Sequence, residues 1–561
     1  MAYVDKVNVQ GTDYNLYKYN DSLNVINVAV GTTMGDIVTQ LASVNTAGDH
    51  VVFDVSALNA GMYLCTIYTN EGYYRIADLV TGFEGTGFYL DTDLLADIIK
   101  SGSQSTGKHY TVQFDQVTAQ MTRLNDAASI TTDTTNFKFS GSVNANYNNP
   151  FDDIYPWSGR KLCNIDIDLY RGLTSGASIE DCVTAWEGDV NFSYTDQYGV
   201  WVYTPPFYGR SYILGNYRYF DVTDENLQNN IYYPASIVGR WLGVDTVLTI
   251  DGVSKHCNLP TVGVPMNNVS GTNMHTYAKN YGASLNDIYR LDAVSLLYFV
   301  EYANANIQAT LGNGVSDLYR QSSDLIKANA TSSNVVQIEN ATAIWQECVE
   351  GAEFDIGTSN GGQQVGKYYI VSATQNGTLI DVTLNEAVTV TTSHYWSIHG
   401  LANIPDSDIG SKSGYIGTNG RSNAYYRGQT FYANKFQYIL GIYKQADTQE
   451  IYVTSESETD DYDALNTSAM TDTGLAIPTS NGYVKIFGMA EGFSFLPVCI
   501  ETGTGAYGDY FYTGNTTYSR CLWFGGSSTN GGYCGFCGTW NAASSNSNWA
   551  FASCPRLKTP S

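Results

Sequence analysis

The sequence predicts an α+β protein in which short β-strands dominate. Of its 561 residues, 45 are tyrosine and 54 are glycine, whereas only 15% are charged. Strands favour aromatic and β-branched residues, and glycine serves the turns between them. A chain of this length is expected to form several domains of about 100–200 residues each. The composition indicates a β-rich, loop-rich protein of an extracellular or virion surface, and it is atypical of a helical cytosolic enzyme.

Residues 1–130 are expected to form a β-rich N-terminal domain. Residues 51–55 (VVFDV) and 63–68 (YLCTIY) combine β-branched and aromatic side chains, as strands do. A short helix is expected over residues 36–41.

The start of this domain indicates a role for it. Residues 4–14 (VDKVNVQGTDY) resemble the opening of structural proteins of gut phages. In such proteins the N-terminal part attaches to the virus particle, so the resemblance implies particle attachment by residues 1–130. The next stretch, residues 131–144, is rich in Thr, Asn and Ser and is expected to be a linker.

Residues 145–330 are expected to form the first part of a second domain. Within it, residues 200–208 (VWVYTPPFY) predict a strand that stops at Pro205 and Pro206. Proline ends a strand because it has no backbone N–H to donate to the ladder.

The strongest helical signal of the chain lies near the end of this part. Apolar residues recur at three- and four-residue spacing on two faces of residues 285–303, which predicts a buried helix. Ser284 is the expected N-cap, with Asp287 three positions on as a weak capping box. Gly312 is the expected stop. Glu301, inside the helix, is expected to be a paired structural carboxylate and not a catalyst.

Residues 331–410 are expected to form a small inserted β domain. Two strand-like runs, residues 367–371 and 378–384, flank the pair Asn376-Gly377, which is a strong hairpin signal. Further strands are expected at residues 387–391 and 395–398.

Residues 411–561 are the expected second part of the second domain, and they end in a distinctive segment. Residues 519–549 place five Trp and Phe side chains among Gly, Ser and Asn, with almost no charge. Binding loops have this composition, because rigid aromatics supply contact area and small polar residues adapt their hydrogen bonds. The alternative is an unstructured glycine-rich tail, but disordered segments lack aromatics.

A pattern of regularly ordered residues runs through this segment. In order, it consists of Arg520, Gly525-Gly526, Asn530-Gly531, Gly535-Phe536, Ser544-Ser545, Asn548 and Arg556-Leu557. The pattern resembles the variable region of diversity-generating-retroelement target proteins, which are phage and bacterial proteins whose C-terminal codons are rewritten at adenines. Members of that family fold this region into a C-type-lectin-like domain of the formylglycine-generating-enzyme (sulfatase-modifying-factor) type, which displays a ligand-binding face.

A second stretch carries the same resemblance. The formylglycine-generating-enzyme-like fold has Gly-Asn-Val-Trp-Glu-Trp where this chain has residues 433–438; Asn434 matches, and aromatic residues replace both tryptophans. The resemblance covers about residues 145–330 and 411–561. It implies an α+β protein in which a β-rich N-terminal attachment domain precedes a C-type-lectin-like domain that carries a small β insertion.

The resemblance also divides the segment into framework and contact residues. Hydrogen bonds are expected to hold Arg520 and Arg556, whereas contact residues should point outward from the scaffold. The expected framework residues are Arg520, Gly525, Gly526, Gly535, Ser544, Ser545, Asn548, Arg556 and Leu557. Adenine changes in an Asn codon do not reach Trp, so each tryptophan is equally well explained as a core residue. Within about residues 519–554, the expected ligand-binding residues are Trp523, Ser527, Thr529, Asn530, Tyr533, Cys534, Phe536, Cys537, Trp540, Asn541 and Trp549.

The chain carries no recognisable catalytic motif. It has no phosphate-binding glycine loop, His-Glu-x-x-His or Gly-x-Ser-x-Gly sequence. Cys534 and Cys537 form a C-x-x-C, but a zinc site needs a second pair or a nearby His, and a redox motif needs a strand-to-helix context. His394 and His399 are expected to be hydrogen-bonded or exposed. We therefore expect no catalytic residue, no metal and no cofactor.

Charge and hydropathy narrow the expected partners. The chain has 54 Asp and Glu against 28 Lys and Arg, a net charge of −26, which disfavours nucleic acid and anionic membranes. No apolar run of about 18 residues occurs, so membrane insertion is not expected. The first residues lack the charged-then-apolar pattern of a signal peptide. We expect a protein that is made in the host cytoplasm and released by lysis on the virion surface.

These observations favour a phage receptor-binding protein, an adhesin of the tail tip or tail fibre that attaches the virion to its host. Expected partners are a host cell-surface receptor, protein or glycan, and other virion proteins through the N-terminal domain. A homotrimer is expected, because repeated weak sites gain avidity. Two alternatives stay open. One is a capsid or head decoration or fibre protein with the same fold, and the other is a tail enzyme that degrades surface polysaccharide with a carboxylate pair.

Overall fold

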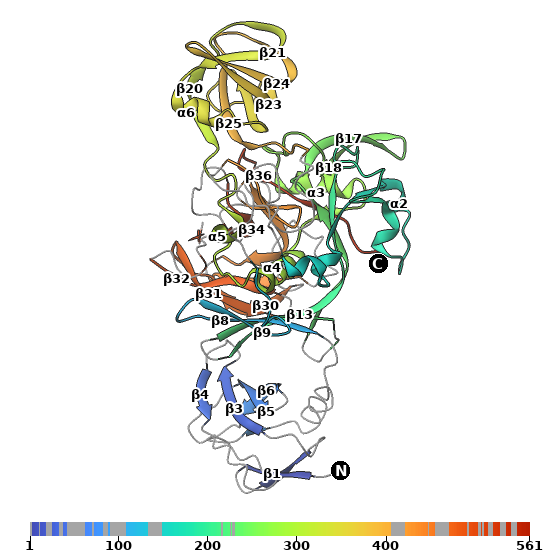
Figure 1. The fold of residues 1–561 in the computed structure, drawn as a ribbon, viewed down its shortest axis with the longest axis vertical. Helices are drawn as coiled ribbons and strands as arrows, with labels where there is room; N and C mark the ends of the chain where they lie inside the picture. Colours follow the sequence, from blue (N-terminus) through green and yellow to red (C-terminus); the bar gives the residue numbers. More distant parts are fainter. Residues whose placement is uncertain are drawn as a thin grey trace. The chain divides into compact units, whose positions relative to one another are not determined.

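The structure of the chain is a computed structural model, drawn in Figure 1. It describes the backbone of seven strands within residues 1–89 and, farther along, the backbone and most side chains. The described residues of this later part are 108–132, 149–214, 217–224, 226, 230–405, 421–432, 434–446, 448–454, 470–490, 493–502, 507, 510–513, 520–527, 535–539 and 547–560. The described chain is mainly β, with small and almost entirely antiparallel sheets, which confirms the expected strand-rich class.

The chain divides into two compact units. One consists of residues 1–130 with 207–232, and the other of residues 131–206 with 233–561. Of the predicted linker, residues 131–144, only the first two residues are described.

Two prolines stand at the point where the chain passes from one unit to the other. β12 (Trp201–Thr204) ends before Pro205, and β13 (Phe207–Leu214) begins after Pro206. The predicted end of the strand is confirmed. The sequence placed the residues after it in the second domain, but β14 (Tyr217–Thr223) pairs with a strand of the first unit.

The described residues of the first unit form three small sheets. A two-stranded sheet joins β1 and β2, and two five-stranded sheets have the orders β4-β3-β5-β6-β7 and β15-β13-β14-β8-β9. The strand bounds are β1 (Tyr3–Val9), β2 (Thr12–Tyr17), β3 (Val25–Thr32), β4 (Ile37–Leu41), β5 (Met62–Thr69), β6 (Gly72–Thr81), β7 (Phe88–Tyr89), β8 (His109–Asp115), β9 (Gln120–Asn125) and β15 (Ile231–Tyr233).

Two of the N-terminal expectations can be compared with these strands. The predicted strand at residues 63–68 lies in β5. The short helix predicted at residues 36–41 is wrong, because this stretch is strand β4 and pairs with β3. Three of its five residues are β-branched, which favours strand over helix. The strand predicted at residues 51–55 lies outside the described residues.

Outside residues 319–401, the described part of the second unit is built on two larger sheets, and we refer to this part as the body. The first has the order β11-β10-β12-β16-β37-β19; the second has the order β30-β29-β28-β34-β35, with β36 parallel to β28. Their bounds are β10 (Lys161–Ile165), β11 (Val183–Trp186), β16 (Ser236–Gly239), β19 (Ser284–Leu285), β28 (Phe436–Lys444), β29 (Glu450–Val453), β30 (Thr471–Ala476), β34 (Arg520–Gly525), β35 (Gly535–Thr539), β36 (Phe551–Ala552) and β37 (Pro555–Arg556).

Smaller elements surround these sheets. They are the hairpin of β17 (Val244–Ile250) and β18 (Val253–Leu259), the hairpin of β26 (Ala424–Tyr426) and β27 (Gln429–Tyr432), the sheet of β31 (Gly482–Ala490), β32 (Phe493–Glu501) and β33 (Tyr510–Phe511), and the helices α2 (Ile167–Arg171) and α3 (Gly271–Lys279). One apolar core joins the first sheet to β28, since Trp201, Leu285 and Tyr438 belong to a single buried cluster. Segments on either side of the insertion therefore share one core.

The predicted buried helix is α4 (Ile288–Tyr302), in which every residue except Tyr289 is buried. Its N-cap is Asp287, whose side chain accepts a hydrogen bond from the Arg290 N–H at 2.9 Å. The predicted cap, Ser284, is wrong, because Ser284 belongs to β19 and pairs there with Arg556. That pairing joins residues far apart in the chain, so local sequence does not reveal it.

The end of α4 also differs from the prediction. The helix ends at Ala303, which adopts a left-handed conformation with φ of 47°. Gly312 instead ends the next helix, α5 (Ile307–Leu311), with φ of 84°. No helix of the described part is both long and apolar enough to cross a membrane.

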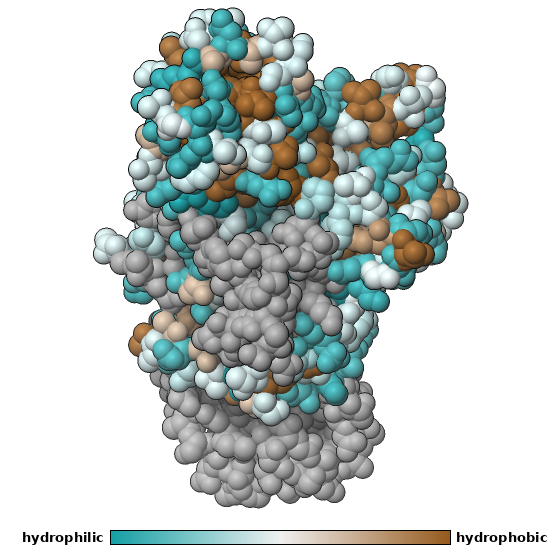
Figure 2. All heavy atoms as spheres, turned by 45° about the horizontal axis from the view of Figure 1, so that its top comes forward, coloured by the Kyte–Doolittle hydropathy of each residue, from teal (hydrophilic) through white to brown (hydrophobic). Residues whose placement is uncertain are grey.

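A six-stranded sheet spans residues 319–401, where the sequence predicts a β insertion at residues 331–410. Its order is β20-β25-β22-β23-β24-β21, and it has a core of its own, to which Phe354, Ile380 and Trp396 contribute. Its outer surface carries exposed apolar residues among hydrophilic ones (Figure 2). The bounds are β20 (Tyr319–Leu325), β21 (Ala330–Glu339), α6 (Thr342–Glu347), β22 (Ala352–Gly357), β23 (Gly366–Asn376), β24 (Leu379–Val390) and β25 (Tyr395–Leu401). We refer to this sheet as the insert.

The predicted hairpin is confirmed inside the insert. β23 and β24 pair from Asn376 opposite Leu379, and Gly377 turns the chain with a φ of +61°. Glycine suits this turn because it adopts positive φ without steric cost. The strand predicted at residues 387–391 is the end of β24, and the one at 395–398 lies in β25.

Candidate ligand-binding site

The end of the predicted binding segment is fixed by a buried arginine. Arg556 Nε lies 2.6 Å from Asp287 Oδ2 and donates to the Leu285 carbonyl oxygen at 3.2 Å. Arg556 and Asp287 are both buried. The expectation that hydrogen bonds hold Arg556 is confirmed; of Arg520 only the backbone is described. The Asp287 side chain therefore links two elements, because it pairs with Arg556 of β37 and also caps α4.

Other framework residues occupy positions that suit their residue types. Gly525 and Gly526 are buried and have φ of 95° and 84°, a left-handed conformation that favours glycine. The Asn548 side chain accepts from the Ala550 N–H at 3.0 Å, and its carbonyl oxygen accepts from the Asn268 N–H at 3.0 Å. The glycine pair and Asn548 therefore lie on either side of residues 527–541, which contain most of the predicted contact residues.

Most of the predicted contact residues have no described side chain. The backbone alone is described for Trp523 in β34 and for Phe536 and Cys537 in β35. These two strands pair, with Trp523 opposite Thr539. Six further positions lie outside the described residues, namely Thr529, Asn530, Tyr533, Cys534, Trp540 and Asn541.

The two contact residues with described side chains are not displayed freely. Ser527, directly after the buried glycine pair, is only 1% exposed, whereas a contact residue needs a surface position. Trp549 is half-buried. Its ring stacks on His399 (4.7 Å between centroids) and on Tyr319 (5.0 Å), and it also packs against the core of the body. Of the two roles open to the tryptophans, Trp549 takes mainly the packing role.

A buried lysine ties the segment end at Trp549 to the insert. Lys435 Nζ is fully buried and lies 2.7 Å from Glu353 Oε2 of β22. It also donates to the carbonyl oxygens of His399 (2.9 Å) and Trp549 (3.1 Å). The three acceptors come from three separate segments, so this one ammonium group joins β22, β25 and the C-terminal segment.

The neighbouring Asn434, the residue that matches the family motif, makes a second link to the insert. Its side chain accepts from the Leu401 N–H at 3.0 Å and donates to the Leu401 carbonyl oxygen at 2.8 Å. Gly400 has φ of 105°, and a Cβ there would lie 2.3 Å from Asn434 Oδ1. The close approach therefore requires glycine at position 400.

Two carboxylates and a histidine complete this charged cluster. Asp355 Oδ2 is hydrogen-bonded to His399 Nδ1 and accepts from Gln363 Nε2 at 2.6 Å, and Glu353 Oε1 accepts from Asn267 Nδ2. Burial raises the pKa of Glu353, and the Lys435 ammonium lowers it in part. The expectation of a hydrogen-bonded His399 is confirmed. The sequence did not single out the carboxylates, although their i, i+2 spacing would have placed both on one strand face.

The ligand atoms of Glu353, Asp355 and His399 lie within 4.8 Å of one another, close enough to hold a metal ion. However, Lys435 already supplies a positive charge at Glu353. Lys367 also pairs in register with Asp355, and burial lowers its pKa. Two ammonium groups oppose a cation here, so the donor set fits internal ion pairs better than a metal.

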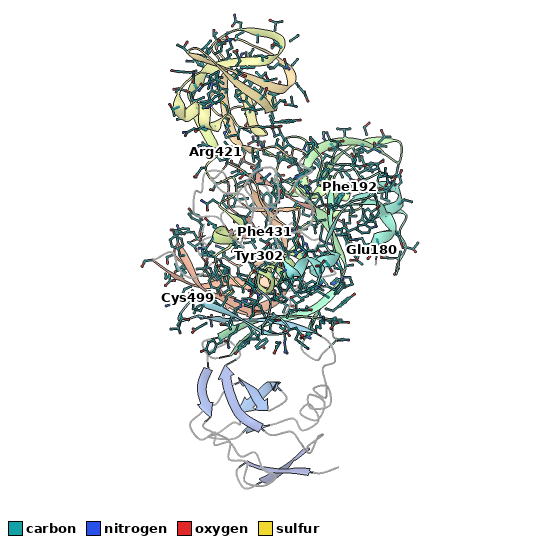
Figure 3. The ribbon with its side chains drawn as sticks, in the orientation of Figure 1. Glu180, Phe192, Tyr302, Arg421, Phe431 and Cys499 are labelled. Carbon is teal, nitrogen blue, oxygen red and sulfur yellow. The ribbon has the colours of Figure 1, made fainter. Side chains whose placement is uncertain are left out.

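A second buried network centres on Glu301 of α4. Arg427 Nε and Nη2 each donate to its carboxylate at 2.8 Å, Asn149 Nδ2 donates at 2.7 Å and the Tyr426 hydroxyl at 2.8 Å. The Tyr426 ring contacts the rings of Tyr302 and Phe431, which Figure 3 labels in the body. The prediction that Glu301 is a paired structural carboxylate is confirmed.

Comparisons with known proteins give no family for this chain. No protein-family model matches it, and no curated protein matches its sequence.

Proposed function

We propose that this chain is a receptor-binding protein of a phage virion, an adhesin of the tail tip or fibre. It binds host-surface ligands through residues 519–554, which a C-type-lectin-like domain displays and which a diversity-generating retroelement rewrites. The support is the ordered framework pattern of this segment and its aromatic, uncharged composition.

The observation that carries the proposal is the fixed position of the framework residues. Gly525 and Gly526 adopt a conformation that favours glycine, and the buried Asp287 holds Arg556. A segment that tolerates substitution between its ends needs such a rigid frame, since contact side chains must change without loss of the fold. Ser527 and Trp549 are excluded from the proposed diversified contacts, because Ser527 is buried and the half-buried Trp549 ring is fixed by its stacking on Tyr319 and His399, which leaves it unsuited to substitution.

The remaining parts of the chain receive matching roles in this proposal. Residues 1–130 attach the chain to other virion proteins, and the chain forms a homotrimer. Trimer formation multiplies a weak site without any new contact. Light scattering of the purified chain at micromolar concentration should give about three times the mass of 61.4 kDa; a monomer would contradict this part.

The head-decoration alternative shares the binding face and differs only in location on the virion. The enzyme alternative needs two carboxylates that flank a sugar bond. Among the described residues, the buried carboxylates of Glu301, Glu353 and Asp355 are already bonded to Arg, Lys, His or amide groups. These three carboxylates are therefore poor candidates for such a pair.

The test uses the purified full chain on envelope fractions from a panel of gut bacteria. A triple variant, Asn530→Ala, Tyr533→Ala and Asn541→Ala, alters contact residues and leaves the framework intact. We expect it to lose capture by the fraction that retains the wild-type chain. The control, Asn376→Ala on the insert, should keep capture. If the envelope fraction captures the triple variant as well as the wild-type chain, the proposal is wrong.

A further inference from the structure

One surface of the second unit combines fixed amides with partly exposed aromatic rings. It lies where the insert meets the body, and none of its members is charged. Its six residues, named here the amide–aromatic patch, are Asn268, Tyr319, Gln321, Gln363, Asn548 and Trp549. We propose that this patch binds a neutral saccharide. The inference rests on the receptor-binding function and adds to it a ligand class and a second contact surface.

The six residues come from four chain segments, and direct contacts make them one surface. The Asn268 N–H donates to the Asn548 carbonyl oxygen at 3.0 Å, and its Nδ2 donates to Gln363 Oε1 at 2.7 Å. Trp549 follows Asn548 and stacks on Tyr319. The Tyr319 hydroxyl in turn donates to Gln321 Oε1. Each neighbour therefore touches the next.

The buried cluster below fixes the direction of these amides. Asp355 Oδ2 accepts from Gln363 Nε2, so Gln363 Oε1 is turned toward Asn268. Asn268 itself has a φ of 54°, in the left-handed region where Asn is one of the few tolerated residues. A relay of this kind, from a buried carboxylate to an exposed amide, orients polar groups before the ligand arrives. Such pre-organisation reduces the entropy lost on binding.

Three polar atoms of the patch are available to bond a ligand. Asn268 Oδ1, Gln321 Nε2 and Asn548 Nδ2 have no hydrogen-bond partner among the residues that the structure describes. They offer one acceptor and two donors. Sugar hydroxyls both donate and accept, so they match this mixture. Tyr319 and Trp549 add apolar ring surface for the C–H face of a sugar ring.

The charges around the patch select a neutral ligand. Lys435 is fully buried and bonded to three acceptors, and the half-buried Lys367 donates its Nζ to the Asn267 carbonyl oxygen at 2.9 Å. An anionic polymer would find no exposed cation in the patch, and the net charge of −26 would repel it. A protein partner would need a larger apolar centre than two half-buried rings supply.

The experiment measures binding of the full chain to an array of neutral saccharides, and then by calorimetry to the saccharide retained best. The first variant is Asn268→Gly, because glycine keeps the left-handed backbone and removes only the amide. The second is Tyr319→Ala. Each should lower the affinity about tenfold or more, the size of a hot-spot loss. The control Asn376→Ala removes an exposed amide elsewhere on the insert and should stay within about twofold of wild type.

Two results would overturn the inference. One is a wild-type chain that binds no neutral saccharide; the other is wild-type affinity in Asn268→Gly and Tyr319→Ala. If Tyr319→Ala fails to fold, Gln321→Ala, whose side chain is exposed, takes its place. Capture of host envelope without saccharide binding would leave the receptor-binding function standing and reject the patch. Absence of both would reject both.

Discussion

Two buried charge networks among the described residues of the second unit, one around Glu301 and one around Lys435, are built differently. In the first, the Glu301 carboxylate accepts four hydrogen bonds, two of them from Arg427. In the second, Lys435 is fully bonded, but Asp355 Oδ1 and His399 Nε2 are buried without a partner among the described residues. The first network is closed, whereas the second is partly open.

This difference separates a structural network from one that supports a surface. The closed network joins α4 to the β26–β27 hairpin within the body. The open network joins three chain segments and orients the amide–aromatic patch above it. A buried polar atom without a partner costs about 1–3 kcal/mol. A protein tolerates such a cost more readily at a functional site than in a frame.

The largest effect is expected from breaking the closed network. Glu301→Gln should lower the free energy of unfolding by about 3 kcal/mol, because Arg427 then remains buried without its main carboxylate. Asp152 Oδ1 lies 3.0 Å from Arg427 Nη2 and still pairs with the guanidinium in the variant. The loss should therefore fall at the lower end of the range usual for a broken buried ion pair. Denaturant titration at pH 7 measures this. The control Glu339→Gln breaks an exposed ion pair with Lys327 and should cost at most about 1 kcal/mol. A comparable cost in both variants would contradict the comparison.

Lys435→Met should break the open network at a lower cost, about 2 kcal/mol at pH 7. The Glu353 carboxyl that loses its partner can take up a proton, since burial already raises the pKa of Glu353. Its protonated form is neutral and avoids the penalty of an unpaired charge. The cost should therefore shrink as the pH falls toward 5, whereas the cost of Glu301→Gln should not shrink in the same way. Denaturant titrations at pH 7 and pH 5 measure the loss of stability in both variants. If the loss in Lys435→Met is the same at both pH values, Glu353 stays ionised.

A substitution outside both networks should separate binding from folding. Tyr533→Ala should weaken receptor binding by about 1–3 kcal/mol, the range of a hot-spot aromatic, and leave the unfolding transition unchanged. Envelope capture and thermal unfolding of the same preparation measure the two effects. Unfolding of the variant would assign Tyr533 to the scaffold.

The smallest effect concerns the pH dependence of stability. Burial raises the pKa of Glu353, so the folded state favours the protonated carboxyl. Its contribution to stability is complete below the ordinary pKa of Glu and is lost as the pH rises through the higher folded value. Wild type should therefore lose slightly more stability than Glu353→Gln as the pH rises through this window. Matched unfolding curves between pH 4 and 7 measure the difference, and parallel pH profiles would contradict it.

Local pattern predicted the elements whose cause is local. The apolar spacing of α4 predicts its burial, because a helix apolar on all sides has only the core to face. Gly377 predicts the β23–β24 turn, and the proline pair predicts the end of β12, because each restricts the backbone by its own chemistry. The predicted burial of α4 also led to the expectation that Glu301 is paired, whereas the expectation that Arg556 is held came from the resemblance to a known family.

Only the tertiary structure reveals which side chains pair with one another in the buried networks. Nothing near Glu301 in sequence identifies Arg427, and nothing near Lys435 identifies Glu353, His399 or Trp549. Ser284 does not cap α4, because it pairs in a sheet with Arg556, which lies more than two hundred residues away in the chain. Ser527, in a segment of binding-loop composition, is buried by packing that composition does not encode. The physical reason is shared: backbone conformation is set largely by neighbours in the chain, whereas burial and charge pairing are set by neighbours in space.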